Sequence, residues 1–204
     1  MARLRTFIAL DVGKVVRDRL VALQESLAHA AQEVKWVEPE NLHVTMLFLG
    51  EVDDRAVLEV CRAVGESCRP LTPFTLNVEK VGCFGNPRRP RTVWVGVGDG
   101  AEEVKALHAV LEEKLRALRY YRREERQFTP HITLGRVKQD GSAEGLAPLL
   151  QKKADWQGGP LEVREVLVMS SQLTPQGPIY TVLSRAPLQR GRRADDESPS
   201  RDSV

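Results

Sequence analysis

The chain has 204 residues, of which 42% are hydrophobic and 28% are charged, so it is long enough for one large domain or two small lobes around a real core. A formal net charge of only +2 excludes a global field of one sign, and any basic surface for a polyanion must come from local clustering. No apolar run approaches the roughly 20 residues that span a bilayer, and the first residues lack a signal-peptide pattern, so we expect no membrane partner.

The three cysteines are odd in number and lack C-x-x-C spacing. Cys61 and Cys68 also fall on the apolar side of a predicted helix. We therefore expect free thiols in a reducing compartment, and a cytoplasmic protein.

The first half of the chain alternates strands and helices. Hydrophobic periodicity predicts the helices, and runs of β-branched and apolar residues predict the strands. The expected elements are strands over 4–11, 34–37 and 42–49 and helices over about 14–31 and 54–67, the second capped by Asp53 or Asp54.

The second half repeats this order approximately. A Gly/Pro/Asn-rich turn is expected over 83–91, between two strands. The other expected elements are strands over 74–81, 92–97, 161–170 and 178–186, a helix over about 104–118 and a short helix around 143–152. His108 lies about 60° from the centre of the apolar stripe of its helix, so we expect a structural role for it.

Two segments share a four-residue pattern. The stretch "NLHVTMLFLG" at 41–50 contains His43 and Thr45, and "QFTPHITLGR" at 127–136 contains His131 and Thr133. Each reads His, β-branched residue, Thr, apolar residue, and the two strands hold comparable places in the two halves. This indicates a weak internal duplication with two copies.

The pattern predicts a catalytic site for displacement at phosphorus. Residues i and i+2 of a strand project from the same face, so each histidine shares a face with its threonine. If the two strands meet across a cleft, one imidazole can take a proton from water while the other protonates the leaving oxygen, and the hydroxyls can hold non-bridging oxygens.

Two other interpretations apply to the same residues. A single His-x-Thr in a strand is usually a packing feature, but two copies that use half of the four histidines favour a site. Two histidines are too few ligands for a metal, and neither motif has Asp, Glu or Cys at ligand spacing, so we expect no metal and no cofactor.

The two motifs resemble the HxTx signatures of the two-histidine (2H) phosphoesterases, most closely the LigT-like RNA 2′,3′-cyclic phosphodiesterases, formerly described as 2′-5′ RNA ligases. "LRTFIALD" and "VLVMSSQLTPQGPIYTVLSRAPL" are similar to the opening and closing strands of that family. The resemblance covers about residues 3–188. It implies that His43 is the proton donor, His131 the proton acceptor, and Thr45 and Thr133 the phosphate ligands.

Other residues are candidates for binding the rest of the substrate. Arg136 follows the second motif, and Arg126 belongs to an arginine cluster around Tyr120 and Tyr121. Arginines interleaved with aromatic residues suit RNA phosphates and bases, although charge runs are often solvated faces. The candidates for stacking on the terminal base are Phe7, Trp36 and Phe48, each of which also has a core interpretation.

These inferences define an α+β fold with two lobes, each an antiparallel sheet with helices outside, and with the HxTx strands facing across a central groove. Residues 1–188 form one bilobal domain, and residues 189–204 a disordered charged tail. The expected function is metal-independent hydrolysis of RNA 2′,3′-cyclic phosphate ends to 2′-phosphates by a monomeric enzyme that takes RNA 3′ ends or cyclic nucleotides. Alternatives are a 2′-5′ RNA ligase, another cyclic-phosphate or oligonucleotide phosphodiesterase, and a non-catalytic RNA-end-binding module.

Overall fold

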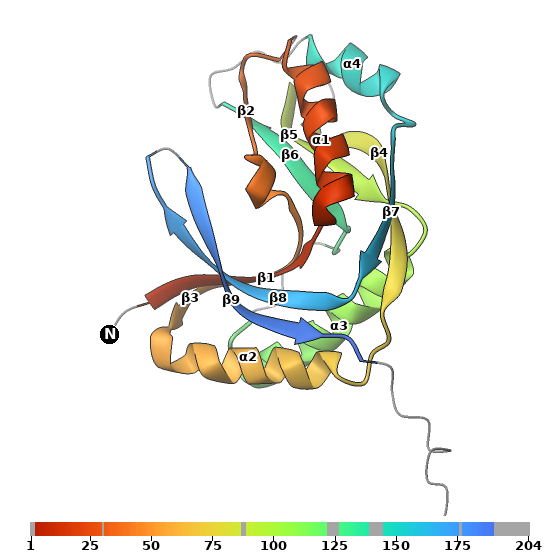
Figure 1. The fold of residues 1–204 in the computed structure, drawn as a ribbon. Helices are drawn as coiled ribbons and strands as arrows, with labels where there is room; N and C mark the ends of the chain where they lie inside the picture. The colour runs from red at the N-terminus through yellow and green to blue at the C-terminus, as the bar shows by residue number, and fades with distance from the viewer. Residues whose placement is uncertain are drawn as a thin grey trace, which may run out of the picture.

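The fold is built on one nine-stranded antiparallel sheet (Figure 1). The computed structural model describes residues 3–29, 31–86, 89–121, 127–138, 145–175 and 177–189. Strand order along the sheet is β7-β4-β5-β6-β3-β1-β8-β9, and β2 pairs with β6. The strands are β1 (Arg3–Asp11), β2 (Val34–Trp36), β3 (His43–Asp53), β4 (Phe74–Asn86), β5 (Arg89–Val97), β6 (His131–Val137), β7 (Gln157–Val163), β8 (Glu165–Leu173) and β9 (Pro178–Pro187).

Helices cover the two ends of the sheet separately. They are α1 (Gly13–Ala28), α2 (Asp54–Cys68), α3 (Ala101–Ala117) and α4 (Leu146–Lys152), with a short 3₁₀ turn over Pro39–Asn41. In Figure 1, α1 and α4 lie at the end formed by β2 and β4–β6, and α2 and α3 lie below β1, β3, β8 and β9. The contacts agree, since α1 packs on β7 and α4 on β4 and β5, whereas α2 packs on β8, β9 and α3.

The α+β class, the two lobes and the antiparallel pairing are confirmed. The two expected sheets are continuous, because β3 of one lobe pairs with β6 of the other at Val44 and Ile132. This pairing makes the sheet continuous between the lobes and is the place where the two HxTx strands meet.

Helix periodicity explains how the outer helices bind the sheet. In α1 the residues at i, i+4, i+7 and i+11 are buried, and they are Val16, Leu20, Leu23 and Leu27. Burying one such side chain contributes about 1.5–3 kcal/mol, so the stripe is a large part of what holds α1 on its lobe. The helix ends at Ala28, three residues before the expected end, directly after its last buried leucine.

The turn expected over 83–91 is wrong. β4 extends to Asn86, and β5 begins at Arg89, with Cys83 opposite Val93 and Phe84 opposite Thr92. Cross-strand pairing therefore overrides the local turn preference of the glycine and prolines, and a long β4–β5 hairpin projects where a loop was expected.

The strand expected over 161–170 is also wrong, because the structure divides it at Arg164. β7 pairs with β4 and β8 pairs with β1, so the chain crosses from one lobe to the other at this point. The face turned to the main core changes phase there: Leu161 and Val163 belong to that core before the break, and Val166 and Val168 after it, whereas Leu167 and Met169 are buried in a second cluster on the other face. A strand of period two cannot bury both sets on one face.

The remaining boundaries agree with expectation within a few residues, except that β3 continues past Gly50 to Asp53. The Asp53 carboxylate accepts the Arg55 backbone N–H at 3.1 Å and so caps α2, as expected. All three cysteines are free thiols, of which Cys68 is fully buried. Among the described residues no helix is long and apolar enough to cross a membrane. The tail beyond residue 189 lies outside the described residues.

Candidate active site

The four motif residues project from one face of the sheet at the junction between the lobes. Val44 and Ile132, the residues between each His and Thr, pair with each other and are fully buried in the main core. Because side chains alternate along a strand, His43 and Thr45 on β3 and His131 and Thr133 on β6 lie on the opposite face. All four are partly exposed.

The junction has approximate two-fold symmetry. Antiparallel pairing at Val44 and Ile132 places Thr45 beside His131 on one side of that pair and Thr133 beside His43 on the other. The structure therefore brings together the four residues that the sequence singled out, from segments far apart along the chain.

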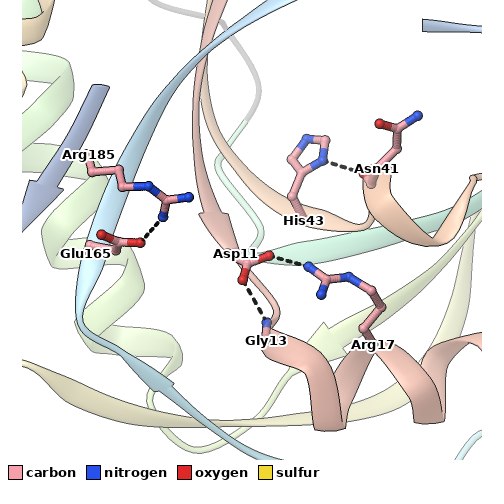
Figure 2. Close-up of polar contacts among 7 residues, drawn as sticks. All are labelled: Asp11, Gly13, Arg17, Asn41, His43, Glu165 and Arg185. Carbon is pink, nitrogen blue, oxygen red and sulfur yellow. Dashed lines mark hydrogen bonds and ion pairs between the residues drawn. The ribbon is translucent and has the colours of Figure 1, made fainter. Parts of the chain in front are cut away.

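Each histidine is held by the backbone carbonyl two residues before it. His43 Nδ1 lies 2.7 Å from the Asn41 carbonyl oxygen (Figure 2), and His131 Nδ1 lies 2.7 Å from the Thr129 carbonyl oxygen. A carbonyl oxygen can only accept, so Nδ1 carries the proton in both rings. In the neutral tautomer Nε2 is then the basic nitrogen of each ring.

His43 has a second partner in its own motif. Its Nε2 lies 2.8 Å from Thr45 Oγ1, so the neutral ring accepts the hydroxyl proton of Thr45. The turn that carries Asn41 is fixed by a hydrogen bond from the Asn41 amide to the Pro178 carbonyl oxygen at 3.1 Å. These contacts hold the His43 ring in one orientation.

Burial lowers the pKa of both histidines, which favours their neutral forms. For His43, the nearby His131 ring also lowers the pKa, whereas the Asn41 carbonyl and the Asp11 carboxylate raise it. For His131, burial lowers the pKa, the Thr129 carbonyl raises it and the Arg136 guanidinium lowers it further. Apart from the other histidine, the side-chain charge that shifts the pKa is negative for His43 (Asp11) and positive for His131 (Arg136).

Asp11 is a site neighbour that the sequence did not indicate. It ends β1 directly opposite His43. Figure 2 shows its carboxylate accepting hydrogen bonds from the Arg17 guanidinium and from the Gly13 backbone N–H, the latter at 3.2 Å. The carboxylate is therefore fixed near His43 without contacting its ring nitrogens.

Aromatic rings enclose His43. The Phe7 ring centroid lies 5.2 Å from that of His43, and Tyr180 meets His43 edge-on at 5.5 Å. Phe7 is only 2% exposed, so it packs behind His43 and has no free face for a base, contrary to the expected stacking role. Tyr180 comes from β9, a long-range contact that sequence spacing does not reveal.

Aromatic rings also flank His131. Phe84 meets it edge-on at 4.8 Å and Trp94 lies at 6.4 Å. The Trp94 ring lies against Gly82 of the paired strand, where a Cβ would lie only 2.4 Å from the ring, so the glycine makes room for it. Phe84 was missed because its segment was interpreted as a turn.

The other predicted binding residues fall into three groups. Arg136 is exposed and lies near His131 and Tyr180. Its charge lowers the pKa of both side chains, although burial raises the pKa of Tyr180 overall. Phe48 is 51% exposed beside Phe7. Trp36 is partly buried against the main core, over Gly135 across β2 and β6, and does not line the pocket described below. Arg126 lies outside the described residues.

A pocket of about 1060 Å³ opens from the junction. Of the four motif residues, Thr45 and His131 line it, and further walls come from β3, from the tip of the β4–β5 hairpin, from α3 and from the segment before β6. Within the described part of the chain no three His, Cys, Asp or Glu side chains form a group that could hold a metal ion.

Sequence comparisons identify a family and several relatives. A family model described as LigT like Phosphoesterase matches residues 10–94 and 95–180. The RNA 2′,3′-cyclic phosphodiesterase of Methanothermobacter thermautotrophicus is 36% identical over 88% of this chain and 96% of its own length. That of Archaeoglobus fulgidus is 37% identical over 87% of this chain and 96% of its own.

Solved structures share the fold. The protein TT0787 of Thermus thermophilus superposes with a TM-score of 0.79 at 28% identity, covering 93% of this chain and all of that one. Escherichia coli LigT complexed with 3′-AMP superposes with a TM-score of 0.72 at 23% identity, covering 92% of this chain and 99% of that one.

Proposed function

This chain belongs to the LigT-like phosphoesterase family, and from that membership and the geometry of its junction we propose that it hydrolyses 2′,3′-cyclic phosphate ends of RNA by two-histidine acid–base catalysis. Relatives of this length that carry the name RNA 2′,3′-cyclic phosphodiesterase support the reaction. The observation that carries the mechanism is the Val44–Ile132 pairing, which places two imidazoles and two hydroxyls on one face.

The proposed reaction is an in-line displacement at phosphorus. His131 Nε2 takes a proton from a water molecule as the water oxygen forms a bond to phosphorus. The bond from phosphorus to the ribose 3′ oxygen breaks, and that oxygen receives a proton from His43 Nε2. The products are a 2′-phosphate and a 3′-hydroxyl, and the two histidines exchange their protons with solvent to restore the starting state.

The unequal surroundings of the two rings support this division of roles. The Asp11 carboxylate raises the pKa of His43, which favours the protonated form that an acid needs. The Arg136 guanidinium lowers the pKa of His131, which favours the neutral form that a base needs. A bound phosphate anion adds to the first effect, because it stabilises an imidazolium next to it.

The threonines bind the phosphate in this scheme. A hydroxyl next to each ring can donate to a non-bridging oxygen as negative charge develops there. Thr45 has a second role, since its hydrogen bond to His43 Nε2 fixes that ring before substrate enters. Once His43 is protonated, its Nε2–H can donate to the leaving oxygen, and the Thr45 hydroxyl proton is free to donate to the phosphate.

Arg136 and Phe48 are the proposed contacts to the remainder of the substrate. Arg136 is exposed and its guanidinium can pair with phosphate in two parallel hydrogen bonds. Phe48 has half of its surface exposed within the pocket that starts at Thr45, so its ring can stack on the terminal base.

The donor set supports chemistry without a resident metal. Two imidazoles and two neutral hydroxyls lack the third nitrogen, sulfur or carboxylate ligand that catalytic zinc sites use. Asp11, the nearest carboxylate, is already engaged by Arg17 and by the Gly13 N–H. We therefore propose full activity in EDTA.

We also propose that residues 1–188 act as one bilobal, monomeric domain in the cytoplasm. The continuous sheet supports one domain, and three free thiols suit a reducing compartment. Light scattering of the purified chain and limited proteolysis test the first two points.

The test is to incubate the chain with an oligonucleotide that ends in a 2′,3′-cyclic phosphate and with free cyclic nucleotides, and to identify the products. Conversion to a 2′-phosphate in EDTA supports the proposal. Tight binding without turnover indicates an RNA-end-binding module, joining to a 5′-hydroxyl RNA indicates a ligase, and turnover only of 2′-5′ linkages indicates a different phosphodiesterase.

A further inference from the structure

The pocket is larger than the proposed chemistry requires. At about 1060 Å³ it stands at the upper end of the roughly 300–1,000 Å³ of small-molecule sites. The motif residues Thr45 and His131 line part of it. The remaining wall runs along α3, through Lys105, His108 and Glu112, and along the segment of Gln127 and Phe128.

Besides Phe48, which the proposed function assigns to the terminal base, two further aromatic surfaces line this space. The first is Phe84, which is 39% exposed and touches His131, so a base stacked there belongs to the nucleotide whose phosphate reacts. The second is a parallel stack of His108 and Phe128, with ring centroids 4.0 Å apart and planes inclined by 10°. Both of its members line the pocket.

From these two surfaces we propose that the pocket holds the last two nucleosides of the RNA, and that the base before the terminal one extends the His108–Phe128 stack. This inference rests on the proposed function, and it identifies the preferred substrate as an RNA end of two or more nucleotides. Stacking on an aromatic ring accepts every base, so the subsite reads the presence of a base and not its identity.

The polar lining suits the connection between the two nucleosides. The Lys105 ammonium is partly exposed in the pocket wall and forms an ion pair with Glu102 at 2.7 Å on the outer side of α3. It can exchange that surface partner for the phosphodiester that links the two nucleosides, because an exposed ion pair is worth little.

The experiment compares three substrates that share the terminal cyclic phosphate. They are a 2′,3′-cyclic mononucleotide, the corresponding dinucleotide, and a dinucleotide whose first residue lacks its base. A stacked base contributes enough affinity to lower KM roughly 10-fold. We therefore expect kcat/KM to be highest for the dinucleotide, lower for the abasic dinucleotide and lowest for the mononucleotide. Lys105→Gln should narrow the gap between the last two.

Variants of Phe128 separate stacking from folding. Phe128→Leu fills the space without a flat ring and should abolish the advantage of the dinucleotide over its abasic form, whereas Phe128→Tyr should retain it. Val110→Ala, at an exposed position of α3, is the matched control and should change neither ratio. Thermal unfolding of each variant checks that the fold is intact.

Three outcomes contradict the inference. One is equal kcat/KM for all three substrates, and a second is an unchanged dinucleotide advantage in a folded Phe128→Leu variant. A third is an equal fall in kcat/KM on the mononucleotide and on the dinucleotide in the Phe128→Leu variant, which would mean that the His108–Phe128 stack binds the terminal base. Failure of the wild-type chain to hydrolyse any of the three overturns the proposed function itself.

Discussion

The His43 half and the His131 half of the site share their motif, their strand geometry and the hydrogen bond from Nδ1 to the carbonyl two residues earlier. They differ in what surrounds the ring. His43 lies among Phe7 and Tyr180 with the Asp11 carboxylate nearby, and its Nε2 is bonded to Thr45. His131 lies beside the exposed ring of Phe84, with a guanidinium as its nearest charge.

This difference teaches how a duplicated motif can perform two opposite tasks. A proton donor has to keep its proton until the leaving oxygen needs it, and a nearby carboxylate together with a fixed orientation helps it to do so. A proton acceptor has to be neutral and within reach of water, which a nearby cation and an opening to the pocket provide. Symmetry supplies the pair of imidazoles, and the neighbouring charges act on their pKa values in opposite directions, Asp11 raising that of His43 and Arg136 lowering that of His131.

The strongest way to break the comparison is to remove each ring. His43→Ala and His131→Ala should each lower kcat on a cyclic-phosphate oligonucleotide by roughly 10²–10⁴-fold, because each removes one proton transfer. Steady-state kinetics measures the loss, and circular dichroism checks the fold.

The two alanine variants should differ on an activated substrate. A p-nitrophenyl phosphodiester of a nucleoside has a leaving group that needs no protonation, so it should recover activity in His43→Ala and not in His131→Ala. Recovery in His131→Ala alone means that the roles are reversed.

The threonines give the next largest effect. Thr45→Val and Thr133→Val keep shape and remove one hydroxyl, and each should cost about 10²-fold in kcat, as for loss of one donor to a developing oxyanion. Only Thr45→Val should also change the pH profile, since only Thr45 is bonded to a histidine in the free enzyme. Identical profiles for the two variants argue against that second role of Thr45.

The charged neighbours should move the limbs of the pH–rate profile by smaller amounts. kcat/KM falls at high pH as the acid loses its proton and at low pH as the base gains one. Asp11→Asn removes a charge that raises the pKa of His43, so the alkaline limb should move to lower pH. Arg136→Gln removes a charge that lowers the pKa of His131, so the acidic limb should move to higher pH.

A pH profile that narrows from both sides in the double variant supports the assignment. If both substitutions move the same limb, then Asp11 and Arg136 act on the same histidine, which contradicts the assignment. Asp18→Asn, an exposed carboxylate paired with Lys14, is the control and should leave both limbs in place.

The smallest effect concerns stability. Both histidines have a folded-state pKa below the unfolded value of 6.5. Near and below pH 6.5 the unfolded chain therefore binds more protons than the folded chain. The contribution of the two histidines to the free energy of unfolding keeps its full value above about pH 6.5 and falls as the pH drops below it. Thermal unfolding should show a midpoint that drops less between pH 7 and pH 5 in His43→Ala than in wild type, and an equal or larger drop contradicts the pKa direction.

Much of the site could be predicted because its signal is local. Each copy of His-x-Thr has a β-branched central residue. Its four residues therefore predict both the catalytic groups and the strand face on which they lie. The outer helices were equally clear, since the α1 stripe depends only on spacing along the chain. A family resemblance over both halves then gave the reaction.

What could not be predicted depends on register between distant segments. Asp11 reaches His43 through the pairing of β1 with β3, and Tyr180 reaches it from β9. Phe84 faces His131 because a segment with turn-forming residues is held as strand by its partner, β5. The division at Arg164 had no clear local signal, because Val166–Met169 are apolar at every position and fit either phase, and only the folded chain shows which of them face the main core.

The acid and base roles illustrate the same limit. The motif is symmetric in sequence, so the assignment had to come from the family resemblance. The structure adds an independent physical argument, because Asp11 and Arg136 lie near different rings. This asymmetry is a property of the folded chain and has no counterpart in the spacing of the motifs.

The most direct test of the central claim is the fate of the phosphate when an oligonucleotide with a 2′,3′-cyclic phosphate end is hydrolysed in ¹⁸O-labelled water with EDTA. Mass spectrometry counts the labelled oxygens, and comparison with authentic 2′-phosphate and 3′-phosphate oligonucleotides locates the phosphate. The account predicts one labelled oxygen on a 2′-phosphate, because His43 protonates the 3′ oxygen as water enters from the His131 side. A 3′-phosphate, or activity that requires an added divalent ion, contradicts it.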